Sequence, residues 1–562
     1  MSRDRKTTLE PLAYALIFCA ALALRLAGIG AHALNDLEAA NALGALNLSR
    51  GVEGTLPGQP GYLALTTATF FVFQASDFFA RFWPALLGAL VMLSPLFFRK
   101  YLGSLVTLLL ALFLAFDPLL VSASTSANGA ILAGLGLLAS MGFWLKRKPV
   151  WMGISLAILL SSGVEMWPGL VAFLLAWAFA RVTPASLELD PIQDKKIFYG
   201  KVALTVAAVL LLPGTLFLSR PQLLTTLGTS LAEYFHSWAV LGQLTFYQAG
   251  LAWLLSVLPG IVFAAWELLA TLKKRDAVTR WLGYWWGFAL LLTVINPSRA
   301  AVELWWASIP MWVLAARRIY TLITDSDVEN RLVFIIQGAL AVALVIFSFL
   351  FFTNLVNRTP VDTASLRNSL LGALLPLALL LVVTLLLGKG WSAPAARYGL
   401  LAGISLLLFI GLFGNTWKAA GLGNRFENEI WRGSAQPVGS KLILSSLSDL
   451  SEWSTGWKNQ MDVLVSGVDS PALRWALRDY EETDYETVYN PNTAPSVIIT
   501  GSDSEVKSLA SYRGQRIVWS VQPDYLSMDI KAWMKWAIFR QAAPRSEVLI
   551  LWARNDLFPG SN

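Results

Sequence analysis

The sequence predicts a polytopic α-helical membrane protein with about thirteen transmembrane helices, followed by an extracytoplasmic α/β domain. Of its 562 residues, 56% are hydrophobic and only 14% are charged, a balance far too apolar for a soluble protein. Long apolar runs follow one another as far as residue 415, and after residue 416 these runs shorten while Asp, Glu, Ser and Asn become common. We therefore expect a membrane domain, 1–415, and an external domain, 416–562.

Each expected span is an apolar run close to the roughly 20 residues that cross a bilayer as a helix. The expected spans are 11–29, 82–98, 103–121, 129–145, 150–164, 167–181, 201–218, 248–270, 279–295, 302–316, 332–353, 367–387 and 397–415. Lys and Arg gather in alternate short loops, which marks those loops as cytoplasmic. This predicts a multi-pass plasma-membrane protein with a cytoplasmic N-terminus and an extracytoplasmic C-terminal domain.

Two outer loops are long enough to hold structure of their own. In the first, 31–81, Asn35 and Glu38 have the spacing of a capping box, which predicts the start of a helix. Apolar residues at helical spacing follow, so we expect an interfacial helix there, and the run Tyr62 to Gln74 predicts a second surface or re-entrant helix. The loop 219–248 also predicts an interfacial helix with a polar face.

The external domain alternates predicted strands with predicted helices, which indicates a small α/β fold with a partly parallel sheet. The expected strands are 461–467, 487–490, 496–501, 515–521 and 547–553. The expected helices are 470–480, with Ser470 as N-cap and Pro471 at the first helical position, 504–512 and 528–541. The acidic run 478–486 is interpreted as a solvated helix end.

Composition also excludes several classes of function. No basic stripe with interleaved aromatic residues occurs, so we expect no nucleic-acid partner. Cys19 is the single cysteine, so no disulfide forms within the chain, and two histidines argue against a His-rich zinc site. A transporter would place paired charges or broken helices at mid-membrane, whereas the notable carboxylates here fall at predicted helix ends.

Four motifs follow one another over the first 124 residues. They are LRLAGIGAHALNDLEAANALGAL (24–46), PGQPGY (57–62), ASDFFARFWPALLGAL (75–90) and AFDPLLVSAS (115–124). In this order they resemble the GT-C superfamily of membrane glycosyltransferases, of the protein O-mannosyltransferase and aminoarabinose-transferase type. The segment SPALRWALRDYEETDYETV (470–488) is similar to a flippase-associated, archaeal-type glycosylation branch of that superfamily.

The resemblance implies an inverting transferase that uses a polyprenyl-phosphate-linked sugar as donor and an acid of the first outer loop as base. The matching acid here is Asp36, with Glu38 beside it. The family usually has two adjacent acids, whereas Leu37 separates them in this chain. On a helix these two carboxylates would point about 160° apart, so we expect only Asp36 to face the site and Glu38 to cap the helix.

Five further residues are candidates for binding substrate. Arg81 and Arg299 are outer-side arginines that either hold a phosphate or anchor helix ends at the lipid headgroups. Asp117, before Pro118, either joins the acceptor side or caps a helix. Glu165, in a short outer turn, and His236, on the second interfacial helix, have the same two interpretations, functional or structural.

The leading hypothesis is a membrane glycosyltransferase that moves a sugar to a lipid, glycan or protein acceptor on the outer face. No cofactor is assigned beyond the lipid-linked sugar phosphate, and a divalent metal is left open. The rival hypothesis is a catalytically degenerate GT-C-like scaffold or subunit of a larger membrane complex, without transferase activity. The separation of the acidic pair by Leu37 is the feature that favours this rival.

Overall fold

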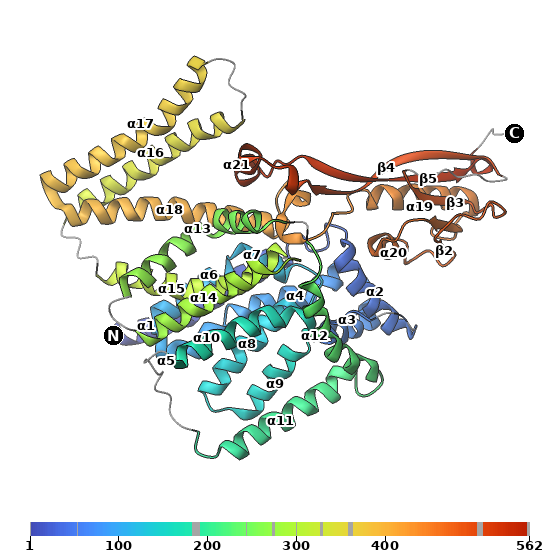
Figure 1. Cartoon of the computed structure of the whole chain (residues 1–562), viewed down its shortest axis with the longest axis horizontal. Coiled ribbons are helices and arrows are strands. Elements are labelled where there is room, and N and C mark those ends of the chain that lie inside the picture. The colour runs from blue at the N-terminus through green and yellow to red at the C-terminus, as the bar shows by residue number, and fades with distance from the viewer. Residues whose placement is uncertain are drawn as a thin grey trace.

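The structure, a computed structural model, describes residues 2–52, 54, 56–182, 192–242, 244–271, 276–298, 300–325, 330–357, 363–502 and 510–558. The predicted helix 504–512 and Arg299 therefore lie largely or wholly outside the described residues. Figure 1 shows a helical body that carries a β-sheet with its own helices at one end, while α16 and α17 project from the body as a hairpin.

Helices occupy all thirteen of the expected spans. In the first half they are α1 (Ser2–Leu26), α4 (Asp77–Val91), α6 (Ser104–Ala115), α7 (Pro118–Ser124), α8 (Ala130–Leu145), α9 (Pro149–Leu160), α10 (Trp167–Val182) and α11 (Lys195–Leu211), and the short α5 (Arg99–Leu102) lies between two expected spans. In the second half they are α13 (Phe246–Thr271), α14 (Ala277–Ile295), α15 (Trp305–Thr324), α16 (Arg331–Asn357), α17 (Thr363–Leu387) and α18 (Ala393–Ala419).

Fewer helices meet the length and apolarity of a membrane span than the sequence predicts. Within the described residues seven do so, or eight if α6 and α7, which meet at a 58° bend, count as one span. The number thirteen is thus not confirmed. The helices α8 and α9 are shorter than 18 residues, and the apolar stretch Leu366–Ala419, predicted as two spans, counts once. The bend falls at Asp117–Pro118, where a proline cannot continue the preceding helix.

The body is held together by close helix packing around large aromatic side chains. Trp285, Trp305 and Trp306 are almost fully buried in its core. A Cβ atom on Gly169 would lie 2.2 Å from the indole of Trp306, so α10 approaches α15 at a distance that only glycine permits.

The structure has helices at the three places where the sequence predicts interfacial helices, and their position at the membrane surface stays a prediction. The first outer loop contains α2 (Asp36–Arg50) and α3 (Pro60–Phe73), and the loop 219–248 contains α12 (Thr225–Ser237). The predicted capping box is confirmed at the start of α2, because the Asn35 side chain accepts from the Glu38 amide and the Glu38 side chain accepts from the Asn35 amide. Gly51, with φ of 75°, ends α2 in the left-handed conformation.

The C-terminal segment forms a five-stranded mixed sheet in the order β2-β1-β3-β5-β4. Its elements are α19 (Ser440–Thr455), β1 (Val463–Ser466), α20 (Pro471–Ala476), β2 (Thr483–Glu486), β3 (Val497–Gly501), β4 (Tyr512–Pro523), α21 (Ile530–Phe539) and β5 (Pro544–Arg554). The pairs β1–β2 and β1–β3 are parallel, and β3–β5 and β4–β5 are antiparallel. The predicted cap Ser470 with Pro471 is confirmed at α20.

The C-terminal segment departs from the prediction in one strand, in the acidic run and in one helix. The strand expected at 487–490 lies instead at Thr483–Glu486, inside the acidic run interpreted as a helix end. An edge strand pairs on one side only and most of β2 is exposed, so charged residues are tolerated there and no apolar pattern reveals it. The helix α19 was not expected.

Candidate functional site

Glu38 joins the junction between α1 and α2 to two other parts of the chain, α4 and the segment around Ala127. The Glu38 carboxylate and the Arg81 guanidinium of α4 form an ion pair of 2.6 Å, and both side chains are at most 4% exposed. Glu38 Oε1 also accepts from Arg81 Nε at 2.8 Å and from the Ala127 amide at 3.0 Å, while Oε2 accepts from the Asn35 amide at 3.3 Å. Both carboxylate oxygens are therefore fully engaged.

Arg81 is engaged in the same way. Besides its bonds to Glu38, Nη1 donates to the carbonyls of Ile29 and His32, each at 2.7 Å, and Nη2 donates to the Ala33 carbonyl at 3.3 Å. A guanidinium has five N–H donors, and all five are accounted for. Arg81 consequently has no free donor for a phosphate, and it acts here as the link between the first outer loop and α4.

The charge state of Glu38 follows from these partners. Burial raises the pKa of the Glu38 carboxyl, but the charge and hydrogen bonds of Arg81 outweigh burial and hold this pKa below its ordinary value. Glu38 is therefore an ionised, buried carboxylate whose two oxygens each accept two hydrogen bonds. Such a group stabilises the fold and is poorly placed to accept a proton from an acceptor hydroxyl.

Asp36 points to the C-terminal domain. Its Oδ1 accepts a hydrogen bond from the Ser470 hydroxyl at 2.6 Å and another from the Ala472 amide at 3.0 Å. These donors belong to the first turn of α20, so Asp36 fixes α20 against the start of α2. The side chain of Asp36 remains partly exposed, and no hydrogen bond engages its second oxygen within the described part of the chain.

Between the two acids, Leu37 is the residue that faces outward. Its side chain is 62% exposed, and its Cδ1 lies 3.9 Å from where a Cβ of Gly433 would be. In the first turn of α2, Asp36 therefore contacts α20 and Glu38 contacts Arg81, whereas the side chain of Leu37 between them is exposed.

Sequence reasoning missed Arg432, which lies in the segment between α18 and α19. Arg432 donates to the Thr125 carbonyl and the Thr125 hydroxyl, each at 3.0 Å, and to the Ala419 carbonyl at 3.1 Å. Its guanidinium also lies 4.4 Å from the ring centre of Phe426. Because these partners are separated by up to 307 positions, only the tertiary structure could reveal them.

His32 is a second missed member of this junction. Its Nε2 lies 2.9 Å from the Gly421 carbonyl, and its ring stacks on Phe426 at 3.9 Å. Burial, and to a lesser degree the positive charge of Arg432 and Arg81, lower the pKa of His32. His32 is therefore neutral near pH 7 and joins the first outer loop to the end of α18.

The other predicted site residues lie apart from this junction. Asp117 is fully buried: Oδ1 caps α7 at the Leu120 amide at 2.8 Å and Oδ2 accepts from Trp312 Nε1 at 2.7 Å. This is the helix-capping alternative of the two considered. His236 is exposed in the last turn of α12. Arg299 lies outside the described residues, so its role stays a prediction.

Glu165, in the short turn Gly163–Met166, is partly buried near a second acid, Glu303 of the turn Ala301–Leu304. Burial and the charge of Glu165 raise the pKa of Glu303 to about 8. Neither carboxylate has an ion-pair partner among the residues that the structure describes.

Within those same residues no group of three His, Cys, Asp or Glu side chains lies close enough together to hold a metal ion.

The fold and this junction define a class: a many-helix membrane protein in which the segment 31–81 is hydrogen-bonded to a C-terminal α/β fold. No family model and no curated protein matches the sequence. Among solved structures, the chain is similar to ArnT from Cupriavidus metallidurans in the apo state, with 13% identity, a TM-score of 0.53 and 98% of each chain covered.

The same protein bound to undecaprenyl phosphate matches with 12% identity and a TM-score of 0.51, covering 97% of this chain and 98% of that one. The Archaeoglobus fulgidus oligosaccharyltransferase in complex with Zn and sulfate gives a TM-score of 0.39 at 12% identity, covering 87% and 68%, a value too low to establish a common fold. The chain therefore shares the fold of ArnT, in agreement with the resemblance that its sequence motifs indicated.

Proposed function

We propose that this protein is a GT-C-type membrane glycosyltransferase that moves a sugar from a polyprenyl-phosphate-linked donor to a lipid, glycan or protein acceptor on the outer face of the membrane. The observation that carries this proposal is the similarity over the whole chain to ArnT, which has been solved with undecaprenyl phosphate. The apolar helices that are long enough to span a membrane support the same conclusion.

In the proposed reaction the acceptor hydroxyl oxygen attacks the anomeric carbon of the donor, and the bond from that carbon to the phosphate oxygen breaks. The configuration inverts, the polyprenyl phosphate leaves with the bonding electrons, and a carboxylate takes the acceptor proton. Asp36 is our candidate for this base through its free Oδ2, because Oδ1 is held by Ser470 and Ala472. Arg299 remains our candidate for stabilising the phosphate.

The Asp36→Asn variant tests the base directly. The amide oxygen of asparagine still accepts from Ser470 and Ala472, so α20 stays docked while the proton acceptor is lost. We expect transfer from a polyprenyl-phosphate sugar in proteoliposomes to fall by a factor of about 10² to 10⁴, with unchanged thermal stability.

The matched control is Ser470→Ala, which removes one hydrogen bond to Asp36 but keeps its carboxylate. This variant should retain transfer within a few-fold of the wild type. Full activity in Asp36→Asn, or equal losses in both variants, would refute the assignment of Asp36 as base.

The second candidate is a GT-C-like protein without transferase activity that acts as a scaffold or subunit. The placement of the first-turn acids favours it, because Asp36 serves as a docking group for α20, Glu38 is saturated, and Leu37 is the exposed residue. A wild-type protein that binds a polyprenyl-phosphate sugar but transfers nothing to any acceptor fraction of its own membrane would support this candidate.

A further inference from the structure

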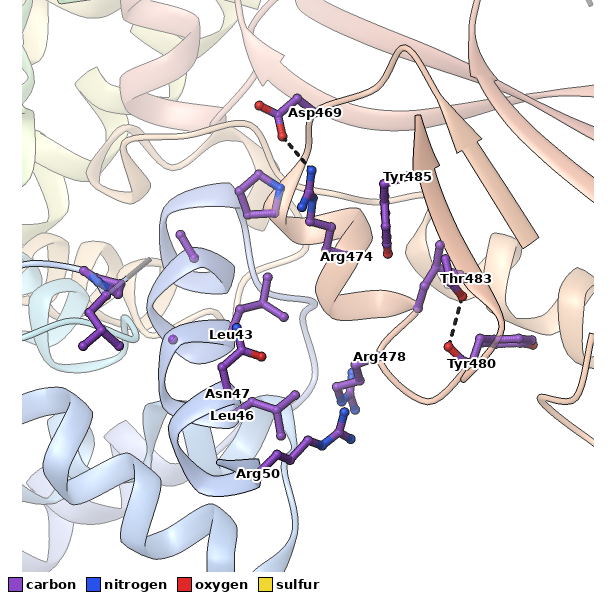
Figure 2. Close-up of a pocket in the computed structure, with 16 residues that line it drawn as sticks. Leu43, Leu46, Asn47, Arg50, Asp469, Arg474, Arg478, Tyr480, Thr483 and Tyr485 are labelled. Carbon is purple, nitrogen blue, oxygen red and sulfur yellow. Dashed lines mark hydrogen bonds and ion pairs between the residues drawn. The ribbon is translucent and has the colours of Figure 1, made fainter. Parts of the chain in front are cut away.

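A cavity of about 640 Å³ lies between the outward face of α2 and the C-terminal domain. One wall is α2, which contributes Leu43, Leu46 and Asn47, and the opposite wall is formed by α20 and the loop into β2 (Figure 2). Small-molecule sites typically measure roughly 300 to 1,000 Å³. The space is thus large enough for a ligand of the size of a monosaccharide phosphate.

The side chains that line the cavity carry a net positive charge. Three arginines and one aspartate are among its lining residues: Arg50, Arg474, Arg478 and Asp469. Figure 2 shows the guanidinium ends of Arg50 and Arg478 pointing toward one another from the two walls. Two like charges that converge repel each other unless an anion lies between them.

Only one ion pair among the described residues involves these two arginines, and it is a long one. Arg50 is exposed and makes no ion pair with any described residue. The nearest carboxylate to Arg478 is that of Asp479, at 3.8 Å, too long for a hydrogen bond, and Arg478 Nε is buried with no hydrogen-bond partner in the described chain. The lining acid, Asp469, is paired with Arg474 at 3.3 Å.

Arg478 is nevertheless held in place. Its Nη1 donates to the Trp475 carbonyl at 2.8 Å, and its guanidinium lies 4.4 Å from the centre of the Trp475 ring. Arg474 is held over the Tyr485 ring at 4.7 Å. Planar guanidinium groups that are oriented in advance suit the oxygens of a phosphate, since they donate in pairs.

From this arrangement we propose that the cavity between α2 and α20 binds a phosphorylated sugar, with Arg50 and Arg478 holding the phosphate from opposite walls. The sugar lies against Leu43 and Leu46, and its hydroxyl groups reach the amide of Asn47. The ligand is either a soluble sugar phosphate or the headgroup of a lipid-borne one, and both present the same phosphate to the two arginines. Binding is measured without turnover, so the proposal does not depend on transferase activity.

The test uses the full chain in phosphatidylcholine nanodiscs and isothermal titration with glucose 1-phosphate, with glucose as the ligand that lacks phosphate. We expect saturable binding of glucose 1-phosphate alone, weakened by added salt. In a second arm the nanodiscs contain undecaprenyl phosphate, and competition with glucose 1-phosphate reports whether a lipid phosphate reaches the cavity.

The variants are Arg50→Ala and Arg478→Ala, each expected to weaken phosphate binding roughly tenfold or more. Arg50→Ala is the decisive variant because Arg50 is exposed and its side chain makes no hydrogen bond or ion pair with a described residue, whereas Arg478 packs on Trp475. The control, Arg516→Ala, removes an exposed arginine of β4 outside the cavity and should leave the affinity unchanged. Unaltered affinity in Arg50→Ala, equal binding of glucose, or no saturable binding in either arm would overturn the proposal.

Discussion

At the scale of single residues, the first turn of α2 shows how two acids acquire different roles from their positions alone. Residues two apart on a helix point in nearly opposite directions. Glu38 therefore faces inward to Arg81 and the Ala127 amide, and Asp36 faces outward to the start of α20. Of the two, only Asp36 has a carboxylate oxygen without a hydrogen bond from any described residue, so the two carboxylates should respond differently to substitution.

Removing Arg81 should destabilise the protein severely. In Arg81→Ala the carboxylate of Glu38 stays buried without its counter-charge, which typically costs about 3–5 kcal/mol. The measurement is thermal or denaturant unfolding in detergent, with Arg516→Ala as the control that removes an exposed arginine. A variant that unfolds at the wild-type midpoint would show that the ion pair is not structural.

The same ion pair sets the direction of a pH effect that serves as a second measurement. The pKa of Glu38 in the folded protein lies below its ordinary value, so the contribution of this group to stability is complete above the unfolded pKa of about 4.3 and is lost as the pH falls through the folded value. Acid unfolding of the wild type should therefore be steeper than that of Glu38→Gln.

At the scale of elements, α20 has only six residues and yet joins two parts of the molecule. Trp475 is 2% exposed, donates from Nε1 to the Asp77 carboxylate at 2.6 Å, and stacks on Phe70 of α3 at 5.8 Å. Residues of α2, α3, α19, α20 and the sheet share one hydrophobic cluster. The segment 31–81 and the C-terminal segment therefore pack against each other through a shared hydrophobic cluster.

Substituting Trp475 should loosen this unit. Trp475→Ala removes a buried indole and its bond to Asp77, a loss of about 3–5 kcal/mol, and proteolytic cleavage of the segment 420–439 should become faster. Trp457→Ala is the matched control, because Trp457 is 67% exposed. Equal cleavage rates in the two variants would mean that α20 is not what holds the domains together.

At the scale of the whole molecule, the orientation in the membrane follows from the distribution of Lys and Arg and remains a prediction. The C-terminal sheet and the helices α2, α3 and α12 gather at one end of the helical body (Figure 1). This arrangement is compatible with a location of all these elements on one side of the membrane, and of the loops that contain the basic residues on the other side.

Cysteine labelling tests this orientation. In a Cys19→Ser background, a membrane-impermeant maleimide added to intact cells should label Ser502→Cys, and Lys148→Cys should be labelled only after the membrane is opened. The reverse pattern would invert the predicted topology and would place the proposed site on the cytoplasmic side.

The sequence by itself determined the features that depend on neighbouring residues. Apolar runs fixed the helices of the body, the Asn35–Glu38 spacing fixed the start of α2, and Ser470 with Pro471 fixed the start of α20. These signals suffice because helix formation and capping involve residues only three or four positions apart. The order of the motifs also indicated the kind of fold, and the structural comparisons show that the chain shares the fold of ArnT.

Only the tertiary structure decided what each side chain contacts. Asp36 meets Ser470 across 434 positions, and Arg432 reaches Thr125 across 307, and no periodicity or local spacing encodes such pairs. These pairs form because the packing of the helices and the sheet excludes water, and a buried polar or charged group costs free energy unless it has a hydrogen-bond partner. For that reason the sequence located the acids of the first loop, whereas the folded chain determined which hydrogen-bond partners each of them has.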